Sequence, residues 1–147
     1  MGTVKRVKLS ELAATVKRDM TELRDRLDHA VEETVRDSQG IVWERVPFAF
    51  GELHNSIHPE PEAHPTRLVA DAPHAAPVEV GSAPHMPPVE PLERWAELRG
   101  LDDPKSAAWA IAKKIEADGT KPTFYMRGSL PRIREVLDRR IKAALGK

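Results

Sequence analysis

Histidine is the residue type in this sequence best suited to chemistry. His54 and His58 lie four residues apart, with His64 and three glutamates close by. On a helix this spacing puts two imidazoles on one face, where they can share a zinc ion. However, Pro59 follows His58 directly, and proline disfavours the helical conformation of the residue before it. There is also no His-Glu-x-x-His arrangement. We therefore predict surface-loop histidines and no metal site.

Other catalytic arrangements have no signature in the chain. The absence of cysteine excludes thiol catalysis and cysteine-ligated metals. The serines lack the Gly-x-Ser-x-Gly elbow, and the eight glycines are scattered rather than gathered in a phosphate loop. Glu79 has no neighbouring carboxylate for paired acid–base chemistry. We expect a protein that is not an enzyme, with no catalytic residues and no cofactor.

The charge pattern gives little support to nucleic acid or membranes as partners. The 23 basic residues balance 23 acidic ones, so no overall field attracts the chain to DNA or to an acidic membrane. No apolar run approaches the ~20 residues needed to span a bilayer. The C-terminal segment is locally basic, with Arg132, Arg139 and Arg140 on its basic face. Without interleaved aromatic residues, we interpret this face as solvated or as a contact for an acidic protein.

The first third of the sequence predicts one long amphipathic helix, residues 10–46, with Ser10 as a candidate N-cap. Gly40 could end it, but the positions of Val42 and Val46 favour continuation up to Pro47. The stripe consists of apolar residues at spacings of three and four: Leu12, Val16, Met20, Leu23, Leu27, Val31 and Val35. Such a helix is roughly 50 Å long, whereas a compact domain of this length is about 30 Å across. Part of the helix must therefore project or pack on another subunit.

The middle segment, residues 47–91, is rich in proline, which makes helices improbable there. Two short strands, Thr66–Ala72 and Pro77–Val80, are predicted to form an antiparallel β-hairpin. Pro77 suits the first position of its strand, and Gly81 ends it.

The last third, residues 91–147, returns to a helical pattern. One helix ends near Gly100, the next starts at Asp103 and closes at Gly119, and a third has Ser129 as its predicted N-cap. Together these elements predict a single α+β domain over residues 1–147 with two to three C-terminal helices.

Four motifs in the middle of the chain occur in a recognisable order: "VPFAFGELHNSI", "DAPHAAPVEVGS", "PLERWAELRG" and "AIAKKIEADGTKPTFYMRGSL". Over about residues 46–130 the chain resembles the head–tail joining, tail-completion or minor tail component family of long-tailed phages and prophages. His74 departs from the pattern, because the family usually has a tyrosine there.

This resemblance implies a non-enzymatic virion protein of the phage neck, made in the cytoplasm of the host bacterium. It implies a homo-oligomeric ring, sixfold or twelvefold, between the portal or head-completion proteins and the tail terminator or tail-tube proteins. DNA would make passing contact in the channel. Glu79 is expected to act either as a contact residue or as a turn-stabilising carboxylate. The expected partner or oligomer contacts are Phe48, Phe50, Leu53, Leu68, Val69, His74, Val78, Glu79 and Val80.

Two alternatives stay open at this point. A tail terminator or a head-completion stopper is a neighbouring role in the same structural class. A small metal- or nucleic-acid-binding regulator, using the histidine-rich loop or the basic C-terminal helix, belongs to a different class.

Overall fold

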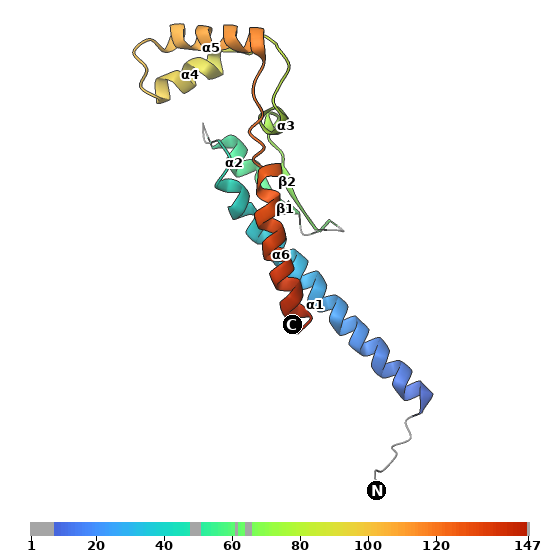
Figure 1. Cartoon of the computed structure of the whole chain (residues 1–147). Helices are drawn as coiled ribbons and strands as arrows, with labels where there is room; N and C mark the ends of the chain where they lie inside the picture. The colour runs from blue at the N-terminus through green and yellow to red at the C-terminus, as the bar shows by residue number, and fades with distance from the viewer. Residues whose placement is uncertain (1–7, 48–50, 61, 64–65, 147) are drawn as a thin grey trace.

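The structure, a computed structural model, describes residues 8–47, 51–60, 62–63 and 66–146 (Figure 1). Helix α1 spans Leu9–Trp43 and runs through Gly40 without a break, so the predicted long helix is confirmed. Its N-cap is Lys8 rather than Ser10, and Lys8 makes no side-chain capping bond. Beyond Trp43 the chain makes one more turn, in which the Val46 amide donates to the Val42 carbonyl.

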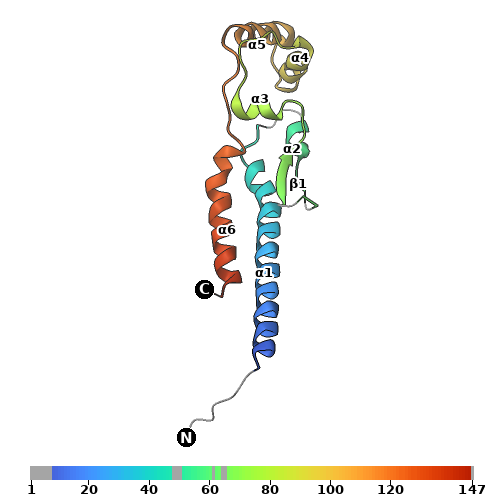
Figure 2. The ribbon, with the colours of Figure 1, turned by 90° about the vertical axis from the view of Figure 1, so that its right-hand side faces the viewer.

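Helix α6, Leu130–Ala144, lies alongside the C-terminal half of α1 and runs in the opposite direction (Figure 2). Arg132 near its start pairs with Glu44, and Arg26 of α1 donates to the carbonyl of Ala144 at its end. The N-terminal half of α1 extends past the end of α6, so the predicted projection of the helix is confirmed.

A two-stranded antiparallel sheet pairs β1, Ile57–Glu60, with β2, Arg67–Ala70. The strand predicted within residues 66–72 is confirmed, but its predicted partner at residues 77–80 is wrong. The real partner is β1, which lies upstream of β2. It was not predicted because it contains Pro59, and proline weakens a strand pattern. In a sheet of two strands each strand has an outer edge, where proline is tolerated.

The residues expected to form the second strand are instead in helix α3, Ala75–Val80. Pro77 fits there because the first turn of a helix leaves its amides without intrahelical partners. A second short helix, α2, spans Glu52–Ser56 and follows Gly51, whose φ of 78° is readily adopted only by glycine. The expectation of no helices between residues 47 and 91 is therefore wrong.

The C-terminal third follows the prediction more closely. Helix α4 spans Val89–Leu98 and packs against α5, Pro104–Asp118. Asp103 caps α5 as predicted, and its hydrogen bonds with Ser106 lower the pKa of its carboxyl. A short 3-10 helix, η1, spans Arg127–Ser129 before α6. Ser129 occupies the N-cap position of α6, as predicted, but makes no side-chain capping bond, because its buried hydroxyl donates to the Tyr125 carbonyl at 2.6 Å.

The core lies where the end of α1 meets the sheet, α3 and the start of α6. Its buried members are Val42, Val46, Leu53, Ile57, Ala72, Ala75 and Tyr125. The fold is thus α+β, as predicted, with helices dominating a small sheet. Within the described ranges, no helix is both long and apolar enough to cross a membrane.

Candidate functional site

Glu79 of α3 holds the start of the C-terminal helical segment. Its carboxylate accepts hydrogen bonds from the backbone amides of Met126, at 2.8 Å, and Arg127, at 2.9 Å. Its own carbonyl accepts from the Phe124 amide at 3.0 Å. A carboxylate at a helix start satisfies amides that have no intrahelical partner. Glu79 therefore stabilises the turn that leads into α6.

Tyr125 anchors the same junction from inside the core. Its side chain is buried, and its hydroxyl donates to the Ala75 carbonyl at 3.2 Å. Burial, and then the negative charge of Glu79, raise the pKa of this phenol. The phenol therefore stays neutral as a structural hydrogen-bond donor.

Two glycines allow the chain to cross itself where the α4–α5 pair joins the rest of the molecule. Ser82 and Thr120 form a single antiparallel bridge through reciprocal backbone hydrogen bonds of 3.2 and 3.1 Å. Beside them, Gly81 and Gly119 have φ values of 81° and 71°. A Cβ on Gly119 would lie 2.1 Å from the carbonyl oxygen of Ser82, so no other residue fits without movement.

The second and fourth motifs of the sequence therefore lie against each other. Residues 75–82 contact residues 119–127 through side-chain and backbone hydrogen bonds. Glu79, Gly81, Gly119 and Tyr125 are all used in building this junction. Two of the four motifs that carry the resemblance are thus explained by contacts within one chain.

The expected contact residues do not form one exposed surface. Phe48 and Phe50 lie outside the described residues. Leu53 is buried, and Leu68 and Val78 pack against the core. The side chains of these three residues are therefore directed into their own subunit. Val69, His74 and Glu79 are half-buried, and Val80 is 65% exposed.

The predicted basic face of α6 is largely neutralised by α1. Arg132 pairs with Glu44, and Arg140 lies 2.5 Å from the Asp37 carboxylate. Arg132 stays exposed although it is paired, and Arg139 is exposed next to Glu135 and Asp138. This arrangement weakens the case for a phosphate-binding face.

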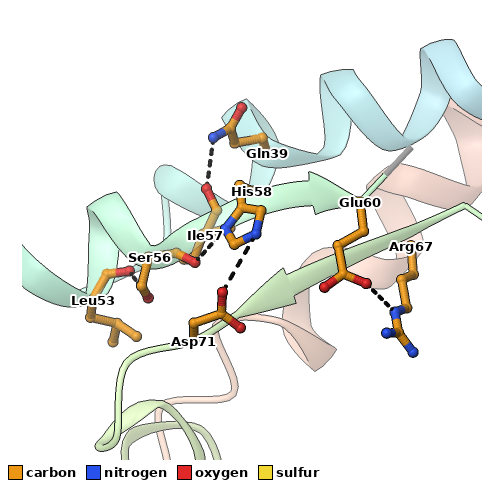
Figure 3. A network of polar contacts seen from close by, with 8 residues as sticks. All are labelled: Gln39, Leu53, Ser56, Ile57, His58, Glu60, Arg67 and Asp71. Atoms are coloured by element: carbon orange, nitrogen blue, oxygen red, sulfur yellow. Dashed lines mark hydrogen bonds and ion pairs between the residues drawn. The ribbon is translucent and has the colours of Figure 1, made fainter. Parts of the chain in front are cut away.

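His54 and His58 both have structural partners. The Trp43 ring stacks on His54 with centroids 4.3 Å apart, and its indole N–H donates to the His54 carbonyl. His58 sits between the Ser56 carbonyl and the Asp71 carboxylate, 3.0 and 3.4 Å away (Figure 3). His54 belongs to α2 and His58 to β1, so they do not share a helical face.

The same close view shows how the sheet is attached to α1. The Gln39 side chain donates to the Ile57 carbonyl at 2.7 Å, and Arg67 pairs with Glu60 across the strands at 2.6 Å (Figure 3). Among the residues that the structure places, no three His, Asp or Glu side chains gather as a metal site. His64 lies outside that range.

The clearest candidate for an interaction site is the projecting half of α1. Lys17 and Arg24 border a shallow apolar groove along this helix. The stripe was evident from its periodicity, but the expected contact residues were placed further along the chain. Its exposed apolar side chains are Leu9, Leu12, Val16, Met20 and Leu23.

The chain matches no family model, no curated protein and no solved structure. Its function must therefore be inferred from its own motifs and surfaces. An exposed apolar helix face offers no group that can perform catalysis, but it suits the binding of another protein surface.

Proposed function

We propose that the chain is a structural subunit of the neck of a long-tailed phage. In this role it is a head–tail connector or tail-completion protein, which assembles into a ring and joins the head, on the portal side, to the tail. The observation that carries the proposal is the apolar stripe on the projecting half of α1. Monomeric proteins rarely expose a contiguous apolar row, so this one favours a protein that works in an assembly.

The assignment to the phage neck is supported by the ordered motifs. Two of them, residues 71–82 and the stretch around Gly119–Leu130, depend on each other in space, because Glu79 binds the Met126 amide and Gly119 borders Ser82. Motifs that share one junction are expected to be kept together and in order. Their joint occurrence therefore carries more weight than any one of them alone.

The shape of the molecule also suits a ring subunit. The N-terminal half of α1 and the α4–α5 pair lie at opposite ends of an elongated molecule (Figures 1 and 2). A ring is built from heterologous contacts, in which one surface of a subunit meets a different surface on its neighbour. The balanced charge of the chain adds no overall repulsion between identical subunits.

A phage in which the gene for this chain is deleted tests the proposal. We expect electron micrographs to show heads and tails that do not join, and a plasmid-borne wild-type copy to restore tailed particles. Normal tailed virions without the protein would refute the proposal. Joined particles with tails of irregular length would instead indicate a tail terminator. Heads that lose their DNA would indicate a head-completion stopper.

A further inference from the structure

The face of α1 that carries the apolar stripe repeats every eleven residues, with apolar members from Leu9 to Val31 and with Thr34 and Ser38 in its third repeat. Its spacing of three, four and four recurs along the helix, starting at Leu9, Met20 and Val31. Eleven residues in three turns give about 3.67 residues per turn, close to the 3.6 of an α-helix, so the stripe drifts little around the axis. The members of this face, in order, are Leu9, Leu12, Val16, Met20, Leu23, Leu27, Val31, Thr34, Ser38 and Val42.

The two halves of this face differ in what covers them. In the C-terminal half, Thr34, Ser38 and Val42 are buried, where α6 and the sheet pack on α1. In the N-terminal half, Leu9 is 81% and Met20 67% exposed. The change occurs near Arg26, where α6 ends. Residues 9–25 span about 25 Å at 1.5 Å per residue. They continue the face of α1 on which α6 packs further along the helix.

A helix that packs on nothing is weakly stable in water, because most helical stability in proteins comes from packing of an apolar face. Residues 9–25 form a regular helix whose apolar side chains are left exposed by the part of the chain that the structure describes. Association with another helix would bury these side chains and stabilise the helix at the same time.

The charges beside the stripe favour a second copy of the same chain. Asp19 lies four residues before Leu23, on one side of the stripe, and Arg24 lies four residues after Met20, on the other. In two parallel helices, flanking residues five positions apart on the two chains face each other. Asp19 of one copy would then meet Arg24 of the copy beside it. Both side chains are well exposed, at 61% and 82%.

We propose that residues 9–25 of α1 form the self-association surface of the protein. They pack in parallel and in register against the same segment of another copy. The inference rests on the proposed function, because both require self-assembly. It adds which surface associates and the relative direction of the two helices. A ring with rotational symmetry places equivalent helices in the same direction along its axis, as this packing requires.

Charge reversal in the full-length chain tests the direction of packing. Asp19→Arg and Arg24→Asp each create like-charge pairs, and we expect each to weaken self-association up to about tenfold in sedimentation velocity experiments. An equimolar mixture of the two variants restores opposite-charge pairs between chains, so association should recover. If a substitution weakens association only by changing its own helix, mixing the two variants cannot restore association. A mixture that associates no better than its components would overturn the parallel arrangement.

A matched pair of lysine substitutions tests the surface itself. Val16→Lys puts a charge in the stripe, whereas Ala14→Lys puts the same charge on the opposite face of the same helix. We expect Val16→Lys to abolish association and Ala14→Lys to leave it unchanged, with circular dichroism reporting the helix content of both. A wild-type chain that stays monomeric at the highest attainable concentration, or a Val16→Lys chain that associates normally, would overturn the inference.

Cysteine cross-linking gives an independent readout, because the chain contains no cysteine of its own. Parallel, in-register helices bring each stripe position next to its own copy, so Leu12→Cys and Leu23→Cys should each form a disulfide-linked dimer. Antiparallel helices can do this at only one of the two positions. Cross-linking at one position alone, or equally at Ala14→Cys, would contradict the proposal.

The virion experiment separates the two proposals. If Val16→Lys supports normal tailed particles while the gene deletion abolishes them, the self-association surface is wrong and the neck role stands. If wild-type chains cross-link through the stripe but the deletion leaves virions normal, the neck role is wrong and the surface stands.

Discussion

Single residues in this protein act mainly by connecting segments that are distant in sequence. Glu79 is the clearest example, because one carboxylate binds two backbone amides in the segment that precedes α6. Hydrogen bonds between a charged acceptor and backbone amides are stronger than neutral ones. Glu79 therefore joins α3 to the start of the C-terminal helices.

Replacing Glu79 by alanine should destabilise the fold by about 1–2 kcal/mol, because two amides lose a charged acceptor. Urea unfolding measured by circular dichroism checks this value. Glu97→Ala, at an exposed position on α4, is the control and should change the free energy of unfolding by less than about 0.5 kcal/mol. Equal effects of the two substitutions would contradict the capping role.

The raised pKa of Tyr125 predicts a loss of stability at high pH. The folded state holds the phenolic proton more tightly than the unfolded chain, in which the pKa is near its ordinary value of 10.0. The contribution to stability is therefore fully present below pH 10 and is lost as the pH rises above it. Tyr125→Phe should lower stability at neutral pH, through the lost bond to the Ala75 carbonyl, and flatten this decline. Unfolding free energies from pH 8 to 11 test this, and parallel curves for the two proteins would refute it.

At the scale of elements, the arrangement depends on how helices are joined as much as on the helices themselves. The α4–α5 pair connects to the rest of the chain through two segments that cross at Gly81 and Gly119. Ser82 and Thr120 are hydrogen-bonded through both backbone and side-chain atoms, with their hydroxyls 2.9 Å apart. The position of the pair is thus fixed by backbone contacts that tolerate no side chain on Gly119.

A comparison of two glycine substitutions isolates this close approach. Gly119→Ala and Gly100→Ala both place alanine at a positive φ, of 71° and 68°, which costs about 1–2 kcal/mol. Only at Gly119 would the new methyl group also collide with backbone, whereas nothing lies within 4 Å of a Cβ on Gly100. We expect Gly119→Ala to be clearly the more destabilising of the two in urea unfolding. Similar free energies of unfolding would mean that the crossing can relax.

At the scale of the whole molecule, the protein is elongated. The free half of α1 extends from one end of the core, and the α4–α5 pair lies beyond the other (Figures 1 and 2). Such a shape leaves much of the chain near solvent and puts surfaces for different neighbours far apart. An assembling subunit can use both ends at once.

Small-angle X-ray scattering of the dissociated chain measures this shape. A compact domain of this length has a radius of gyration of about 15 Å. We expect a clearly larger value, because α1 projects from the core. The Val16→Lys variant is suited to the measurement, since it should remove association without changing the core. A value near 15 Å would show that α1 folds back on the molecule.

Much of the element pattern can be predicted from the sequence. The long helix follows from apolar residues at helical spacing, and its projection follows from its length. The boundaries of α5 follow from Asp103, Pro104 and Gly119, whose preferences are local. The strand at Arg67–Ala70 and the α+β class are likewise evident from composition and periodicity.

The identity of the short elements between residues 47 and 91 was decided by tertiary contacts. Residues 75–80 have the valines of a strand, yet they form a helix, because Tyr125 and the 123–127 segment bind them. Leu53, Leu68 and Val78 looked like contact residues, but the core takes up their side chains. Local sequence determined those elements in which helix signals are strong and capping residues are present. Packing of distant segments determined the short elements, whose few residues carry too little local preference to fix their own conformation.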